Sequence, residues 1–187
     1  IFSITQLEVY SQNCSVNAGT TQTICENATL TLTGVKSGLY QGAGTTTWSQ
    51  VEGPAVIITS PNNLTTTVVG HSGGNSYKFR LSMTCMDGSF VYQDVLVNVL
   101  SISNATASGG FTSCPGSNVG TITGNTPGTN ETGTWVEITD NGGVSLNDIH
   151  SPTPTVSLSN SCGTSTLRWI IENGITACSS TSNVVTI

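Results

Sequence analysis

The same order of landmarks runs through the first and the second half of this sequence. Each half has a cysteine, a glycine, a Gly-Thr step before a tryptophan, a Ser-Pro step, a threonine-rich segment and an aromatic segment with an arginine. Trp48 precedes Arg80 by 32 residues, and Trp135 precedes Arg168 by 33. Self-similarity of this kind indicates two copies of one module.

The two modules are expected to meet near residue 100. Residues 95–99 alternate like a closing strand, and residues 103–110 are a run of small residues that suits a connection. We therefore expect a first domain over residues 1–100 and a second over residues 101–187. Residues 1–13 either end a preceding repeat or add a strand to the first domain.

Strands are expected because good helix formers are scarce. Thr, Ser, Asn and Gly supply 92 of the 187 residues, and all four are poor in a helix interior. Residues 28–33, 64–69 and 77–83 alternate apolar and polar side chains, which is typical of strands with one buried face. Turn residues separate such segments at the spacing of a Greek-key sandwich, so we predict an all-β chain of two tandem Ig-like β-sandwiches.

The charge balance argues against several partners. The net charge is −6, and only four residues are Lys or Arg, so little is available to neutralise phosphates. We expect no nucleic-acid partner. No apolar run reaches the roughly 18 residues that a membrane-spanning helix needs, so we expect no membrane insertion.

Several short motifs resemble a known family of repeats. Ser15 to Cys25, Trp48 to Pro54 and Phe79 to Leu81 resemble the PKD/REJ-like immunoglobulin-type repeats of bacterial cell-surface proteins. In the second half, Gly133 to Trp135 and Leu167 to Gly174 resemble the variant found in very large adhesins of gliding Bacteroidota.

This resemblance implies a function as well as a fold. It implies seven strands in each sandwich and a tandem-repeat segment of a long cell-surface adhesin that serves as a stalk and contact surface in gliding motility. It also implies export by the type IX route, with the signal outside this segment, and no catalysis. Neighbouring repeats of the same chain are the expected partners, with surface glycans or another external ligand as the further contact, and no cofactor is expected.

The six cysteines include no CxxC pair and no Cys/His cluster, which fits an oxidising compartment. In a seven-stranded Greek key, alternate turns lie at opposite ends of the sandwich. Pairing cysteines that share an end gives Cys14–Cys85, Cys114–Cys162 and a bridge between the domains, Cys25–Cys178. The symmetric alternative, Cys25–Cys85 with Cys114–Cys178, stays open, as do free thiols.

Aromatic and charged residues receive structural roles. The expected core aromatics are Trp48, Trp135 and Trp169. Arg80 alternates with apolar neighbours and is expected to face outward and pair with Glu52. Arg168 is expected to pair with Glu137 in the same way.

Residue types that commonly act in catalysis are sparse in this sequence. His71 and His150 fall in turns of different modules, so no base is expected beside a nucleophile. We expect no metal site, although calcium stays open because four acidic residues lie in oxygen-rich loops without the spacing of a calcium loop. These residues are Asp87, Asp94, Asp140 and Asp148.

A second function class remains as an alternative. The chain would then be a carbohydrate-binding accessory module of a secreted polysaccharide-degrading enzyme, which predicts an exposed, coplanar strip of aromatic rings. The candidates are Tyr10, Tyr40, Phe90, Tyr92 and Phe111.

Overall fold

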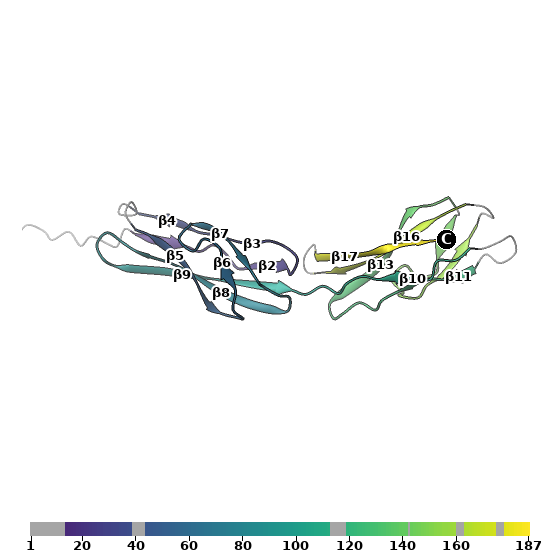
Figure 1. Cartoon of the computed structure of the whole chain (residues 1–187), viewed down its shortest axis with the longest axis horizontal. Helices are drawn as coiled ribbons and strands as arrows, with labels where there is room; N and C mark the ends of the chain where they lie inside the picture. The colour runs from purple at the N-terminus through teal and green to yellow at the C-terminus, as the bar shows by residue number, and fades with distance from the viewer. Residues whose placement is uncertain (1–13, 39–43, 113–118, 142, 160–162, 175–177) are drawn as a thin grey trace, which may run out of the picture. The chain divides into compact units, whose positions relative to one another are not determined.

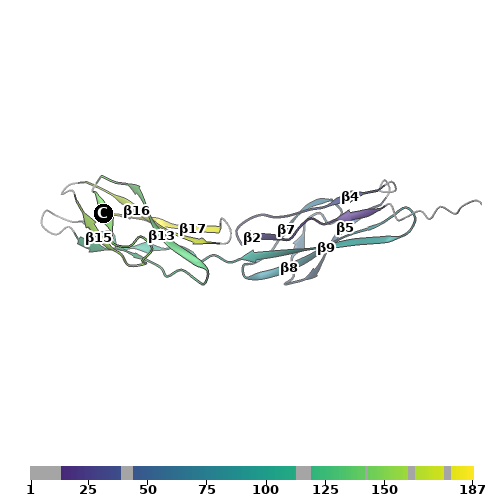
Figure 2. The ribbon, with the colours of Figure 1, turned by 180° about the vertical axis from the view of Figure 1, so that it is seen from behind.

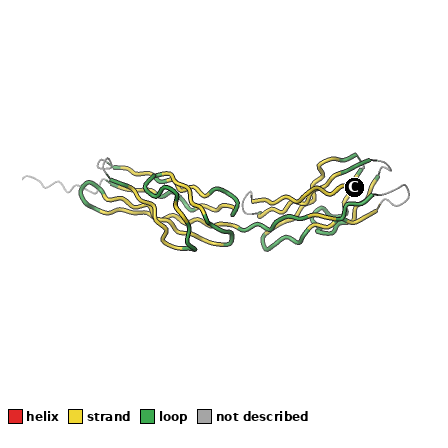
Figure 3. Tube along the Cα trace, viewed as in Figure 1, coloured by secondary structure: helices red, strands yellow, loops and turns green. Residues whose placement is uncertain are grey.

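The computed structural model describes residues 14–38, 44–112, 119–141, 143–159, 163–174 and 178–187. Within these segments the chain forms strands and turns and no helix (Figure 3). No helix that could cross a membrane is found in this part of the chain. The chain divides into two compact units, Ile1–Val99 and Leu100–Ile187.

Unit 1 is a sandwich of two main sheets. One sheet has the order β2-β9-β8-β5, the other has the order β3-β7-β6, and β1 pairs with β4 (Figure 1). The strands are β1 (Ser15–Asn17), β2 (Gln22–Cys25), β3 (Leu30–Thr33), β4 (Val35–Ser37), β5 (Thr46–Glu52), β6 (Ile57–Ile58), β7 (Thr65–Val69), β8 (Asn75–Thr84) and β9 (Phe90–Leu100).

These nine segments fill the seven strand positions of an Ig-like sandwich because the first two positions are interrupted. The first position comprises β1 and β2, which pair with different partners, β4 and β9. Between them Gly19 has a φ of 86°, a left-handed conformation that favours glycine. The second position comprises β3 and β4, and Gly34 lies between them with its Cα close to Leu81 and Trp48.

The core of unit 1 lies between the two sheets. Trp48 on β5 is 2% exposed, and its indole N–H donates to the carbonyl of Leu64 at 3.2 Å. Tyr77, Phe79 and Leu81 on β8 are fully buried. The other buried apolar members are Ala18, Leu30, Leu32, Val68, Val95, Val97 and Val99.

Unit 2 has the same architecture. Its sheets have the orders β11-β15-β14 and β13-β16-β17, and β10 pairs with β12. The strands are β10 (Ala107–Ser108), β11 (Val119–Thr121), β12 (Thr123–Gly124), β13 (Glu131–Thr139), β14 (Val144–Leu146), β15 (Thr155–Leu158), β16 (Thr166–Asn173) and β17 (Cys178–Thr186). Figure 2 shows the same ribbon from behind.

The two cores place different residues opposite the tryptophan of the third strand position. Trp135 lies opposite Trp169 in the β13/β16 ladder, just as Trp48 lies opposite Leu81 in the β5/β8 ladder. Trp169 is fully buried, and the larger ring is accommodated because Gly133 stands directly beneath it. A Cβ on Gly133 would come within 1.9 Å of that ring.

Candidate functional site

One disulfide closes the end of unit 1 that holds the start of β1. Cys14 and Cys85 are bonded, with their Cα atoms 6.1 Å apart, and Met83 packs against them. This is the pairing that the strand directions favour, and it leaves Cys85 unable to join Cys25. Disulfides are typical of proteins that fold outside the cytosol.

Cys25 and Cys178 are also buried and disulfide-bonded. Cys114 and Cys162, the two other cysteines of the predicted pairings, lie outside the described residues, as do Tyr10 and Tyr40.

Cys25 lies at the end of unit 1 from which the chain leaves. The carboxylate of Glu26 accepts a hydrogen bond from the N–H of Gly73 at 3.2 Å. The N–H of the next residue, Gly74, donates to the carbonyl of Val99 at 2.8 Å. The turn after Cys25 and the last residue of the unit are therefore both held by the turn between β7 and β8.

Cys178 lies at the end of unit 2 at which the chain arrives. The N–H of Ser103 donates to Glu131 at 2.7 Å, Glu131 lies opposite Asn173, and Asn173 lies opposite Cys178. Burial alone would raise the pKa of Glu131, but hydrogen bonds from Ser103 and Gly128 outweigh it and hold the pKa below its usual range.

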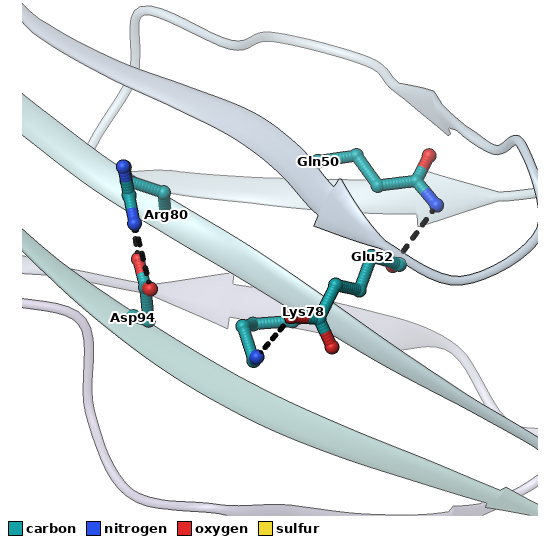
Figure 4. A network of polar contacts seen from close by, with 5 residues as sticks. All are labelled: Gln50, Glu52, Lys78, Arg80 and Asp94. Atoms are coloured by element: carbon teal, nitrogen blue, oxygen red, sulfur yellow. Dashed lines mark hydrogen bonds and ion pairs between the residues drawn. The ribbon is translucent and has the colours of Figure 1, made fainter.

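The ion pairs of unit 1 differ from the expected ones. Arg80 binds Asp94 on β9 through two hydrogen bonds, of 2.7 and 2.9 Å, and Glu52 binds Lys78 instead (Figure 4). The prediction that Arg80 pairs with Glu52 is wrong because β8 places Lys78, not Arg80, opposite Glu52. Hydrogen bonding in the pair raises the pKa of Arg80 and lowers that of Asp94.

Two of the candidate aromatic residues are exposed side by side. Phe90 is 62% exposed and Tyr92 is 55% exposed, and their ring centroids lie 6.2 Å apart with a 39° tilt. The guanidinium carbon of Arg80 lies 3.8 Å from the centre of the Tyr92 ring. Phe111, in contrast, is half-buried in unit 2 against Gly120. The rings of Phe90 and Tyr92 are tilted, so they do not form the coplanar strip that was expected.

The equivalent face of unit 2 has the arginine but not the two rings or the carboxylate. Arg168 occupies the position of Arg80, but it lies opposite Val184 where Arg80 lies opposite Asp94. Glu137 lies opposite Leu167, so the predicted pairing of Arg168 with Glu137 is also wrong. The Nε atom of Arg168 is buried and has no hydrogen-bond partner among the residues that the structure describes.

The two histidines lie in different units and make local hydrogen bonds. His71 Nε2 lies 3.1 Å from the carbonyl of Ala28, in the turn before β3. His150 Nδ1 lies 2.9 Å from the carbonyl of Gly133 on β13 and 3.2 Å from the hydroxyl of Thr134. The described residues that line a pocket of about 610 Å³ in unit 2, beside Phe111, are all uncharged and supply no side-chain acid or base.

The acidic residues considered for calcium have local partners. Asp87 and Asp148 accept main-chain N–H groups within their own turns, and Asp140 accepts those of Gly143 and Val144. Within the described segments, no three His, Cys, Asp or Glu side chains gather in a group that could hold a metal ion.

A structural residue escaped the sequence reasoning. Gln50 donates to the carbonyls of Gly53 and Pro54 at 3.1 and 2.6 Å and accepts from the N–H of Val56 at 3.1 Å. It thereby closes the turn after β5. The sequence shows a glutamine two positions before an acidic residue and a Gly-Pro turn. It does not show that the glutamine side chain hydrogen-bonds to the main chain of that turn, because a polar side chain at this position could equally face solvent.

Comparison with known proteins agrees with this architecture. Residues 18–99 match the family model described as K319L-like, PKD domain. No curated protein sequence matches the chain significantly.

Several solved structures are similar to this chain. The N-terminal eight Ig domains of Down Syndrome Cell Adhesion Molecule align over 94% of this chain with a TM-score of 0.56 at 11% identity, which shows the Ig-like fold. This chain spans 27% of that one. The PKD domain from the KIAA 1837 protein is 26% identical and covers 46% of this chain and 86% of its own, with a TM-score of 0.42. The D00-D0 domain of Intimin is 15% identical and covers 93% of this chain and 98% of its own, with a TM-score of 0.39.

Proposed function

We propose that this chain is a non-catalytic segment of a long cell-surface adhesin, in which two sandwich domains in series act as a spacer and present a contact surface. The observation that carries the proposal is the duplication of an Ig-like, disulfide-bearing sandwich whose polar residues serve turns and strand pairing. PKD-like and Ig-like modules are typically binding or structural modules, and repeats of this kind hold a distal part away from the cell. The neighbouring repeats of the parent chain are its first partners.

The finer assignment follows the sequence resemblance. We propose that the parent protein belongs to the adhesins of gliding Bacteroidota and leaves the cell by the type IX route. The parent reading frame tests this proposal. It should encode several thousand residues of such repeats with a type IX export domain, and a short cytosolic enzyme would contradict it.

We propose further that Cys25 and Cys178 are bonded to each other and tie the two domains. Cys85 is taken by Cys14, so it is not available to Cys25. Cys25 lies at the end of unit 1 where the chain leaves, and Cys178 lies at the end of unit 2 where the chain enters. Along the sequence, only residues 100–102 separate Val99, which is held at the first end, from Ser103, which is held at the second. A bridge there would contribute about 2 to 4 kcal/mol and remove the bending that a short connection permits.

Small-angle X-ray scattering tests the tie as a stiffening device. A variant with Cys25→Ser and Cys178→Ser should show a broader distribution of interatomic distances than the parent chain under non-reducing conditions. The matched control, Cys14→Ser with Cys85→Ser, removes a disulfide inside unit 1 and should leave the distribution unchanged. Identical scattering from the parent chain and the Cys25/Cys178 variant would contradict the stiffening role proposed for the bridge.

A second candidate function has one observation in its favour. The exposed Phe90 and Tyr92 fit a carbohydrate-binding accessory module of a secreted polysaccharide-degrading enzyme. The two candidates differ in what accompanies the domains. A catalytic domain in the same reading frame favours the accessory module, whereas further repeats favour the adhesin.

A further inference from the structure

The outer face of β8 and β9 in unit 1 carries two aromatic rings that the fold does not need. Phe90 and Tyr92 point away from the core, and more than half of each side chain meets water. β8 and β9 lie side by side in both views of the ribbon (Figures 1 and 2). A single exposed aromatic residue is common on protein surfaces. Two large aromatic rings that are exposed side by side are unusual and often mark a binding site.

The Tyr92 ring is held in place before any ligand arrives. Arg80 stacks on it at 3.8 Å, and the guanidinium is itself fixed by two hydrogen bonds to Asp94. Stacking of a cation on an aromatic face is favourable and restricts the ring. Packing of a partner on Tyr92 therefore costs less side-chain entropy than packing on a freely rotating ring would.

The surroundings of the rings favour an uncharged, hydroxyl-rich partner. Arg80 and Asp94 neutralise each other, so the face attracts neither acids nor bases. The outward positions beside the rings are small hydroxyl residues: Ser82 lies opposite Tyr92 on one side and Thr47 on the other, and Ser49 lies opposite Arg80. Beyond Arg80 and Asp94 the same face continues with Leu96 and with Lys78, whose charge is paired with Glu52. Arg80 and Asp94 remain about one-third exposed, and their unused donors and acceptors can bind hydroxyl groups.

We propose that this face, formed by Phe90, Tyr92, Arg80 and Asp94, binds a neutral polysaccharide. A pyranose ring has an apolar C–H face that packs on an aromatic ring and a rim of hydroxyls that the Arg80–Asp94 pair and the nearby serines can bind. The 39° tilt between the rings suits a glycan chain that turns between successive sugars better than a flat one. This inference deepens the contact surface of the proposed function by naming its ligand class.

The second unit provides an internal comparison. In its ladder, Ser179, Thr181 and Val184 stand at the positions of Phe90, Tyr92 and Asp94. Both rings and the carboxylate are therefore missing from the corresponding face, where the β16/β17 ladder also has a register shift between Arg168 and Ile170 that the β8/β9 ladder lacks. The structure assigns glycan binding to unit 1 and none to the equivalent face of unit 2.

A glycan array of neutral and acidic polysaccharides, probed with the full chain, tests the proposal. The chain should bind neutral glycans and should not prefer uronic-acid or sulfated ones. Calorimetry with a neutral hexasaccharide of the best-bound type should then show an affinity at least about tenfold lower for Tyr92→Ala and for Phe90→Ala, a loss of about 1.4 kcal/mol. Arg80→Lys keeps the charge but loses the planar stack and the fork, and should also weaken binding.

The matched control is Val184→Ala at the equivalent face of unit 2, which should bind like the parent chain. Thermal melting of each variant checks that the sandwich is intact. The proposal is overturned if no neutral glycan on the array binds, if only acidic glycans bind, or if Tyr92→Ala binds as well as the parent. It is also overturned if the face proves to be covered by a second copy of the chain, seen as a dimer that Tyr92→Ala dissociates. None of these outcomes bears on the scattering test of the spacer, so the two proposals fail separately.

Discussion

Gln50 shows how a single side chain can hold a turn together. Its amide uses both ends, donating to carbonyls at residues 52–54 and accepting from the N–H of Val56, and a dashed line in Figure 4 marks its bond to Glu52. The turn also needs Gly53: its φ is 101°, and an added Cβ would come within 2.6 Å of the carbonyl oxygen of Ser76, so a side chain is excluded. The sequence shows the Gly-Pro turn but not the amide that closes it.

Replacement of Gln50 tests this role. Gln50→Ala removes hydrogen bonds to several main-chain groups and should lower the free energy of unfolding by about 1–3 kcal/mol. The matched control is Ser49→Ala, one position earlier and exposed, which should stay within about 0.5 kcal/mol of the parent. Chemical denaturation of both variants measures the difference, and equal stabilities would contradict the role.

Glu131 should make unit 2 sensitive to acid. Its folded pKa is lowered, so the stability it contributes is present above the unfolded pKa of about 4.3 and is lost as the pH falls through the folded pKa. Glu131→Gln should therefore lower the melting temperature at pH 7 and weaken its fall below pH 5. An unchanged melting profile between pH 7 and pH 3 would refute this.

Glu137 provides the control of opposite sign. Burial and the neighbouring Asp140 carboxylate raise the pKa of Glu137, so its contribution is present at low pH and lost as the pH rises through the folded pKa. Glu137→Gln should leave the melting temperature at pH 7 equal or higher. A marked drop at pH 7 would show that Glu137 makes a favourable contact as an anion.

At the scale of the strand, each core is matched to its own aromatic residues. In unit 1, Thr46 and Leu81 fill the space that Gly133 and Trp169 fill in unit 2. Gly124 also lies against the Trp169 ring, with a Cβ position 2.7 Å from it. The glycines at these strand positions are therefore explained by ring volume.

Gly133→Ala tests this fit. An added methyl group would overlap the Trp169 ring, which backbone ladders on both sides prevent from moving, and should cost about 1–3 kcal/mol or more. Gly174→Ala is the matched control, because no atom of the described residues lies within 4 Å of its Cβ position and its φ is not in the left-handed region. Thermal unfolding should separate the two, and equal stability would contradict the packing argument.

Alternation in the sequence located the strands well, because one face of each is buried. The ranges 64–69 and 77–83 correspond closely to β7 and β8. Alternation does not specify register between strands, and register decides that Arg80 meets Asp94 and that Glu52 meets Lys78. The exposure of Phe90 and Tyr92 likewise depends on which face of β9 turns inward, so the sequence named them only as candidates.

At the scale of the whole chain, duplication and divergence coexist. Both units have a tryptophan at the third strand position, and in both its indole N–H donates to a carbonyl in the segment before the fifth strand position. Trp48 donates to the carbonyl of Leu64, and Trp135 donates to that of Ser151. They differ in the outward face, where one retains aromatic rings and the other does not. Repeats that share a core but vary their surfaces suit a spacer in which only some members bind a ligand.

Peptide mapping tests the proposed Cys25–Cys178 bridge between the two domains most directly. No Lys or Arg lies between Cys14 and Cys25, so trypsin leaves both on one peptide. Pepsin digestion at acid pH, where few thiols ionise and exchange is slow, followed by fragmentation of the linked peptides in a mass spectrometer, resolves them. The account predicts a peptide pair joining Cys25 to Cys178 that disappears on reduction. Recovery of Cys25 joined to Cys85, or as a free thiol, would contradict it.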